Sequence, residues 1–145
     1  MKVLLQRVES AAVHVEGKTV GRIGSGLLAL VGAEPGDDEA RAIAAARKTA
    51  HLRIFEDSAG KMNLDIGAVG GAALVVSQFT LLASTRKGRR PSFDGAAAPS
   101  VAEPLVEVFA EELERLGLEV ERGSFGAHMR VELVNDGPVT LWVET

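Results

Sequence analysis

The 145-residue sequence predicts a single α+β domain. Two stretches show helical spacing, and the other regular segments are short apolar or β-branched runs bracketed by glycine, as strands are. These strand-like runs are not separated one by one by helices, as a doubly wound parallel sheet would require. A chain of this length buries about 68% of its unfolded surface, which suffices for one ordinary core. Residues 1–145 are therefore expected to form one domain.

The first third of the chain predicts a β-hairpin, a third strand and a helix. Residues 2–15 and 19–23 are strand-like and flank a glycine turn, and the apolar run 27–31 has the length of a buried strand. A Pro-Gly-Asp-Asp segment then supplies carboxylates to the first turn of an alanine-rich helix that ends near residue 50. One face of this helix is expected to carry Ala40, Ile43, Ala44, Arg47 and Ala50. Its small side chains are expected to pack on the sheet, with Arg41, Arg47 and Lys48 mostly solvated.

The middle of the chain predicts two strands, a long loop and a second helix. Residues 52–55 return to strand, and the unbroken apolar character of residues 72–78 indicates a central strand covered on both faces. Residues 86–99 carry cations, prolines and glycine, which is typical of a long functional loop. Ser100-Val101-Ala102-Glu103 has the spacing of a capping box, and Gly117 is a natural helix stop. Helical spacing between them is carried by Val101, Leu105, Val108, Phe109, Glu112, Leu113 and Leu116.

Three further strands are predicted near the C-terminus, at residues 118–121, 128–134 and 139–144. The last is entered through Gly137-Pro138. Proline lacks a donor and fixes its own φ, so it interrupts a sheet unless it lies at an edge, a bulge or a tight turn. We interpret Gly137-Pro138 as a rigid corner between two strands.

The composition is that of an ordinary soluble protein. Apolar residues make up 46% of the chain and charged residues 25%, and there is no cysteine to form a disulfide, a thiolate metal site or a nucleophile. The longest apolar stretches are too short to span a bilayer. We expect a cytoplasmic protein without membrane contact.

Charge is unevenly distributed along the chain. The formal net charge of -4 argues against a general nucleic-acid-binding surface. Residues 86–90, the basic loop, nevertheless gather four cations: Arg86, Lys87, Arg89 and Arg90. This loop is either a local phosphate site or a solvated charge run, and the sequence leaves both interpretations open.

The usual motifs of hydrolytic enzymes are missing. His14, His51 and His128 lie in no recognisable catalytic motif, and neither Gly-x-Ser-x-Gly nor His-Glu-x-x-His occurs. We therefore expect no metal and no cofactor. Ser77 and Thr80 are hydroxyls at a strand end, where most such groups serve ordinary hydrogen bonding.

Three segments point to a family. Leu5-Gln6-Arg7-Val8, Ser77-Gln78-Phe79-Thr80-Leu81 and Asn135-Asp136-Gly137-Pro138-Val139-Thr140 together resemble the D-aminoacyl-tRNA deacylases, whose two paired signatures are both present without substitution. The match runs nearly from end to end. His128 departs from it, since relatives usually carry an acidic residue there.

The resemblance implies a compact fold of curved, barrel-like sheets with two main helices outside. It also implies a homodimer in which each active site receives residues from the partner. The implied activity is hydrolysis of the ester between a D-amino acid and the terminal ribose of tRNA, a chiral proofreading step in translation.

The catalytic residues implied by the resemblance are Ser77, Gln78, Phe79 and Thr80. Because the ester is already activated, positioning and oxyanion donors can suffice for catalysis. We expect the backbone amides between Gln78 and Leu81 to supply these donors, and Phe79 to pack on adenine or ribose. The ribose 2′-hydroxyl would take part in proton transfer, with Thr80 positioning groups without being acylated.

By resemblance, chiral selection falls to Gly137 and Pro138, which would reach into the partner's site and occupy the space of an L side chain. Arg7 would brace this corner by hydrogen bonds to its backbone. Leu81 and Met129 would line the same pocket, although an isolated methionine more often fills a core, and the basic loop would bind tRNA. Achiral glycine escapes such rejection, so mischarged glycyl-tRNA is an expected second substrate.

Two alternative functions are weighed against this one. A non-catalytic RNA- or nucleotide-binding dimer would use the basic loop and Phe93, and substitutions at Thr80 or Gly137 would then change affinity alone. An editing domain like that of some threonyl-tRNA synthetases acts on an L residue. An intact Gly-Pro signature in a free-standing chain disfavours the editing domain.

Overall fold

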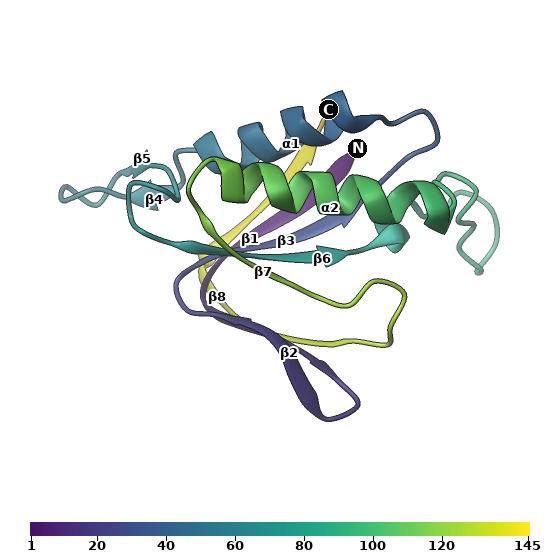
Figure 1. The fold of residues 1–145 in the computed structure, drawn as a ribbon, viewed down its shortest axis with the longest axis horizontal. Coiled ribbons are helices and arrows are strands. Elements are labelled where there is room, and N and C mark those ends of the chain that lie inside the picture. The colour runs from purple at the N-terminus through teal and green to yellow at the C-terminus, as the bar shows by residue number, and fades with distance from the viewer.

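The computed structural model describes residues 1–145 as one curved sheet with two long helices packed against it (Figure 1). The elements in chain order are β1 (Lys2–Val15), β2 (Lys18–Ile23), β3 (Gly26–Gly32), α1 (Glu39–His51), β4 (Phe55–Glu56), β5 (Met62–Leu64), β6 (Ala72–Ser77), the 3-10 helix η1 (Phe79–Leu82), α2 (Pro99–Arg115), β7 (Glu119–Arg122) and β8 (Arg130–Glu144). The main sheet has the order β2-β1-β3-β6-β7, β8 pairs with β1, and β4 and β5 form a small hairpin. The predicted α+β class, with a barrel-like sheet and two outer helices, is confirmed.

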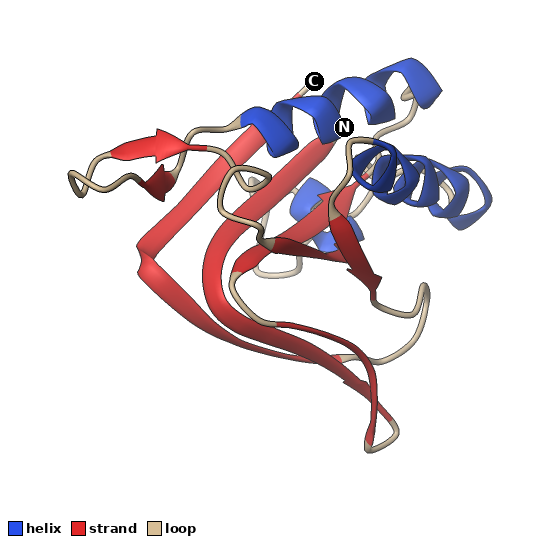
Figure 2. Ribbon diagram, turned by 60° about the vertical axis from the view of Figure 1, so that its left-hand side comes forward, coloured by secondary structure: helices blue, strands red, loops and turns tan.

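Two very long strands give the sheet its curvature. β1 pairs with β3 through its first half and with β2 through its second, while β8 follows β1 along nearly its whole length. The β1–β8 register shifts between Gln6 and Val8 and again between Val8 and Ser10. Bulges bend a strand and increase its twist, so the sheet curls round as Figure 2 shows.

The bulges also explain the imperfect alternation of β1. Val3 and Leu5 face the helices and belong to the larger apolar cluster, which includes the fully buried Phe109. Val8 belongs to a second cluster on the other face of the sheet, together with Ala11. One inserted residue moves the side chains that follow it to the opposite face of the strand. The second cluster therefore contains the even-numbered Val8 before the bulge between Val8 and Ser10, and the odd-numbered Ala11 after it.

The inner face of α1 differs from the prediction. The helix begins after Asp38, whose side chain accepts a hydrogen bond from the Arg41 amide at 2.9 Å. Ala40 and Ala44, expected to pack on the sheet, are exposed, whereas Arg47 is exposed as predicted. Alanine occurs on every side of this helix, so spacing alone does not choose a face, and burial selects the side opposite the arginines. The buried residues are Ala42, Ala45, Ala46, Thr49 and Ala50.

α2 ends as predicted and begins differently. Gly117, with φ +89°, follows its last turn. The helix already begins at Pro99, and its N-cap, Ala98, makes no side-chain cap, so the expected capping box does not form. Proline fits the first helical position because it has no amide hydrogen to leave unpaired there. Ser100 consequently lies inside the first turn, and Val101 is exposed.

Neither α1 nor α2 has the length and apolar character needed to cross a membrane.

Two strand predictions need correction. Residues 52–54 are not in a strand, because β4 begins only at Phe55. Gly137-Pro138, interpreted as a corner between two strands, lies within the single strand β8, which continues from Arg130 to Glu144. β8 is an edge strand that pairs only with β1, so a proline in its bulged part removes no hydrogen bond from a second neighbour.

A buried carboxylate joins the two helices. Glu112 of α2 is 5% exposed and accepts hydrogen bonds from Arg47 of α1 and from Arg115, each at 2.6 Å. The hydrogen bonds from Arg115, and then those from Arg47, lower the pKa of Glu112 from 4.5 to about 2. The charged form is therefore the one that the fold stabilises.

We expect Glu112→Gln to remove part of the acid sensitivity of folding. A depressed pKa contributes stability above the unfolded value of 4.5, and this contribution is lost as the pH falls toward 2. The difference in unfolding free energy between wild type and variant should thus shrink over that range, as measured by denaturant unfolding at successive pH values. Glu111→Gln, on the exposed side of the same helix, is the control and should leave the pH dependence unchanged.

Candidate active site

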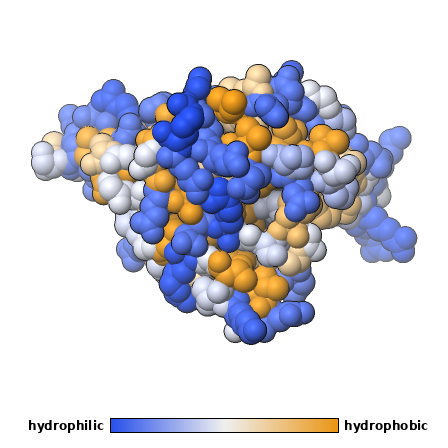
Figure 3. Space-filling model, viewed as in Figure 1, coloured by the Kyte–Doolittle hydropathy of each residue, from blue (hydrophilic) through white to orange (hydrophobic).

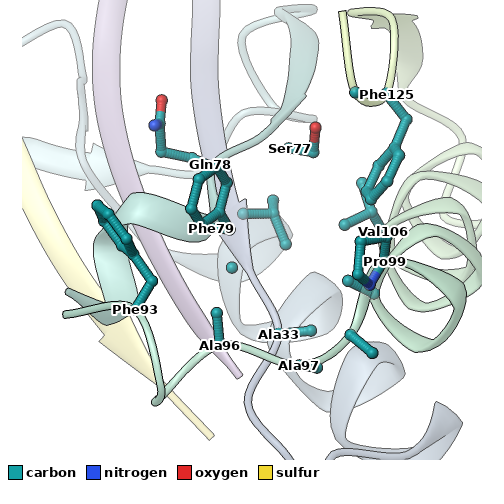
Figure 4. A pocket seen from close by; sticks show the side chains of 15 residues that line it. Ala33, Ser77, Gln78, Phe79, Phe93, Ala96, Ala97, Pro99, Val106 and Phe125 are labelled. Carbon is teal, nitrogen blue, oxygen red and sulfur yellow. The ribbon is translucent and has the colours of Figure 1, made fainter.

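A cavity of about 450 Å³ opens where β6 and β3 end against the start of α2. Ten of its 15 lining residues are hydrophobic. Figure 4 shows Phe125, Val106 and Pro99 along one side of the cavity, with Ser77 near Phe125. Phe79 and Phe93 lie on the opposite side. Four separate chain segments thus build one pocket, which is of the size and character of small-molecule sites.

Two aromatic side chains lie at the entrance of this pocket. Phe79 is 56% exposed and Phe93 is 40% exposed, although apolar rings are usually buried. Their ring centroids lie 5.1 Å apart at an interplanar angle of 65°, an edge-to-face contact. The two rings therefore offer exposed apolar surface at the mouth of the cavity.

Close packing places η1 beside the cavity. The Gln78 amide donates to the Val31 carbonyl at 2.7 Å, which extends the parallel β3–β6 pairing by one residue before η1 turns away. A β-carbon at Gly32 would overlap the Leu82 side chain and lie 3.0 Å from the Gln78 carbonyl oxygen. Gly32 therefore allows η1 to lie directly on the sheet.

Only some backbone amides of this segment are free to act as donors. The Gln78 amide is bonded to Val31, and the Leu81 amide donates to the Gln78 carbonyl at 3.2 Å. Phe79 and Thr80 occupy the first two positions of η1, where N–H groups have no acceptor within the helix. The predicted set of donors between Gln78 and Leu81 narrows to these two.

The pocket contains no group that titrates near neutral pH. Its polar side chains are Ser77 and Gln78, and Gln78 Nε2 donates a hydrogen bond to Thr80 Oγ1. Thr80 is exposed and, like Leu81, lies outside the pocket lining. None of the three histidines lines the cavity. The arrangement can orient and polarise a bound molecule, but it lacks the base beside a hydroxyl that an activated nucleophile needs.

The Gly137-Pro138 segment projects from β8 and is held from behind by Arg7. Both residues are exposed, and the bond between them is cis. Arg7 is 4% exposed; its Nε donates to the Asp136 carbonyl at 3.2 Å and lies 3.1 Å from Asp136 Oδ2. Its Nη1 donates to the Ile54 carbonyl at 2.6 Å. The charge of Arg7 is thus compensated at the residue that precedes Gly137.

Within one chain, the Gly137-Pro138 segment and the pocket lie at different places along the sheet. Arg7 is paired with Leu27 of β3, whereas the cavity touches β3 at Val31 and Gly32 and the adjacent Ala33. Four to six residues of strand at about 3.3 Å each separate the two places by about 13 to 20 Å. Neither Gly137 nor Pro138 lines the cavity.

Comparison with known proteins identifies the family of this chain. The family model described as D-Tyr-tRNA(Tyr) deacylase matches residues 4–144. The chain belongs to this family. It is 63% identical to the D-aminoacyl-tRNA deacylase of Thermomicrobium roseum, covering 100% of this chain and 94% of the relative. It is 59% identical to that of Halalkalibacterium halodurans, covering 100% and 99%.

Solved structures agree on the fold of this deacylase family. The protein named c-Myc DNA Unwinding Element Binding Protein superposes with a TM-score of 0.93 at 37% identity, over 100% of this chain and 99% of that one. A second, described as a probable eukaryotic D-amino acid tRNA deacylase, gives 0.87 at 18% identity, over 99% of this chain and 98% of that one. At that identity the second likeness concerns the fold alone.

The remaining predicted site residues of this deacylase lie in two places. Met129 packs with the second apolar cluster, where its Sδ accepts a hydrogen bond from the Ser124 amide at 3.3 Å, and it does not line the cavity. The basic loop is fully exposed, and its four cations make no ion pair within the chain. It projects at the end of the molecule where Phe93 and the pocket lie, in the hydrophilic protrusion on the right of Figure 3.

Several pocket residues were missed by the sequence interpretation. Ala96, Ala97 and Ala98 line the cavity, although the sequence analysis assigned them only to the long loop over residues 86–99. Phe125 also lines the cavity, but its side chain carries no polar or ionisable group that would mark it as a site residue. The usable signal was the run of small residues 95–98 just after the aromatic Phe93, in a loop too long to serve only as a connection.

Proposed function

We infer that this chain hydrolyses the ester bond of D-aminoacyl-tRNA to give the free D-amino acid and tRNA. The observation that carries this conclusion is the position of the Ser77-Gln78-Phe79 segment at the polar edge of an apolar pocket, in a chain that matches the deacylase family over residues 4–144. The substrate places the enzyme in the cytoplasm, where aminoacyl-tRNA is made and used.

The pocket suits the terminal adenosine of tRNA. Its walls are apolar and its volume of about 450 Å³ accepts a nucleoside. Phe79 and Phe93 stand exposed at the entrance, and stacking of a base on an aromatic ring stabilises binding by about 1–3 kcal/mol. An adenosine held there brings its ribose, and thus the ester, to the edge formed by Ser77 and Gln78. The basic loop would then hold phosphates of the same tRNA.

Catalysis by this site would rest on positioning and on backbone donors. The amides of Phe79 and Thr80 would stabilise the oxyanion as water adds to the ester carbonyl. The proton of that water would pass to the leaving 3′-oxygen through the neighbouring 2′-hydroxyl, because the pocket holds no basic side chain. Thr80, fixed by its hydrogen bond from Gln78, would keep the first turn of η1 in place.

A second copy of the chain would complete the site. Leu4 is paired with Leu30 on one side and Trp142 on the other, so these apolar side chains share the sheet face away from α1 and α2. Trp142 is 47% exposed. η1 lies on this face at Gly32, and β8 leaves its outer edge unpaired. Two copies joined here would bring Gly137-Pro138 of one to the pocket of the other, which one chain cannot do by itself.

In that dimer the Gly137-Pro138 segment would act as a wall at the α-carbon of the bound amino acid. An L side chain would meet this wall, whereas a D side chain would point away from it. Glycine has no side chain to meet it, so glycyl-tRNA would also be hydrolysed. Rejection of this kind depends on rigidity, which the buried Arg7 supplies from behind.

The test is ester hydrolysis of D-tyrosyl-tRNA, L-tyrosyl-tRNA and glycyl-tRNA in metal-depleted buffer. We expect loss of the D and glycyl esters while the L ester persists. Equal loss of D and L esters would contradict the wall formed by Gly137-Pro138. Binding of all three without hydrolysis would instead favour the non-catalytic RNA-binding dimer.

A further inference from the structure

The projecting segment of β8 needs something to replace the ladder hydrogen bonds that its bulge removes. Gln6 is paired with Thr140 and Val8 with Asn135. Arg7 alone therefore stands opposite the four residues 136–139. Residues 136–139 therefore lack regular ladder pairing with β1, although β8 is paired on both sides of them. Side-chain hydrogen bonds can take the place of that pairing and fix the shape of the segment.

Asn135 supplies two of these hydrogen bonds. Its Nδ2 donates to the Arg7 carbonyl at 2.9 Å, across to β1, and to the Val139 carbonyl at 3.0 Å, on the far side of Gly137-Pro138. Both hydrogens of one half-buried amide are thus used. The contact with Val139 ties the two ends of the projecting segment together, and the contact with Arg7 ties them to the sheet.

Arg7 and Asn135 hold different parts of the segment. The Arg7 side chain contacts Asp136, before Gly137, and the Ile54 carbonyl outside the sheet. Asn135 alone donates a side-chain hydrogen bond to Val139, the residue after Pro138, whose own side chain is buried in the larger apolar cluster. Removal of the Asn135 amide would leave the entry of the segment braced by Arg7, while the backbone carbonyl at its exit would lose the one side-chain hydrogen bond that ties it back to Asn135.

We propose that Asn135 is a positioning residue that fixes how far Gly137-Pro138 projects, and that it thereby sets the preference of the enzyme for D over L substrates. This inference rests on the proposed function of Gly137-Pro138 as the chiral wall. Asn135 touches no substrate, since it lies behind the wall with its amide turned to backbone carbonyls. Its effect should therefore be on discrimination more than on the chemical step.

The chemistry of the contact restricts what can replace asparagine. Aspartate has the same shape but would place a carboxylate, which only accepts hydrogen bonds, against the carbonyl oxygens of Arg7 and Val139. Serine keeps a single donor. Alanine keeps none and leaves both carbonyls without this partner.

The experiment compares kcat/KM for D-tyrosyl-tRNA and L-tyrosyl-tRNA in wild type, Asn135→Ala, Asn135→Asp and Asn135→Ser. We expect the D-to-L ratio to fall about 10- to 100-fold in the alanine and aspartate variants and less in the serine variant, the loss expected for one to two hydrogen bonds. The fall should come chiefly from a raised kcat/KM for the L ester. The serine variant serves as the test if the alanine variant does not fold.

Glu132→Gln is the matched control, because His14 Nε2 and Glu132 Oε2 form a side-chain contact of 3.1 Å between the same two strands where the ladder is regular. It should leave the D-to-L ratio unchanged. Asn135 variants with a lowered melting temperature but the wild-type ratio would overturn the proposal and reduce Asn135 to a stabilising residue. A wild-type enzyme that hydrolyses both esters equally would overturn the proposed function as well.

Discussion

Gly137→Ala should reduce the preference for D- over L-aminoacyl-tRNA by about 100-fold, the loss typical of a displacement of about 1 Å at a reacting centre. Gly137 has φ +135°, and a β-carbon there would lie 2.8 Å from the Val139 nitrogen and 3.2 Å from Arg7 Nη2. Since backbone cannot yield as a flexible side chain would, the segment must move. The measurement is kcat/KM for matched D- and L-tyrosyl-tRNA.

The control for this prediction is Gly17→Ala. Gly17 also has a positive φ, +77°, but a β-carbon there meets nothing within 4 Å. This variant bears the strain of a left-handed alanine without displacing the wall, so its D-to-L ratio should equal that of wild type. If both variants lost selectivity equally, general destabilisation would explain the loss and the wall would not.

The strands that were predicted well from the sequence are those that depend on their own residues and immediate neighbours. Residues 27–31 and 72–78 form short apolar runs near glycines, and both became central strands of the sheet. Gly32 has two roles: it is the last residue of β3, and its lack of a side chain allows η1 to lie on the sheet. Local composition determined these elements, so the neighbouring residues were sufficient to predict them.

The predictions that failed depended on distant partners. The buried side of α1 is chosen by the sheet beneath it, since an alanine-rich helix has no strongly apolar stripe of its own. The path of β8 through Gly137-Pro138 is chosen by β1, more than 120 residues away in sequence, which keeps both ends of the bulge paired. Neither partner can be identified from the segment itself.

The site was only half predictable for a related reason. Motif residues with polar groups, such as Ser77 and Gln78, were found at the pocket edge. The walls are alanines and the aromatic Phe125, whose contribution is shape, and shape arises only when four segments meet. The donors are backbone amides, which are present at every residue and become distinctive only at the start of η1.

The proposal that two copies of the chain share each site predicts a result that only mixed dimers can give. One chain carries Ala96→Trp, which places an indole in the cavity beside Phe93 and abolishes binding of adenosine. The other carries Gly137→Ala. Each homodimer should be defective, the first without hydrolysis and the second without discrimination. Two different affinity tags allow the heterodimer alone to be purified.

In the heterodimer the single open pocket belongs to the chain with Gly137→Ala, and the intact wall belongs to the chain with the blocked pocket. If the wall acts in the partner's site, the heterodimer should show the wild-type D-to-L ratio with about half the rate per dimer, because one of two equivalent sites is complete. If the wall acts within its own chain, the open pocket faces the substituted wall and the ratio should be as low as in the Gly137→Ala homodimer. The separation of about 13 to 20 Å between Arg7 and the pocket along β3 favours the first result.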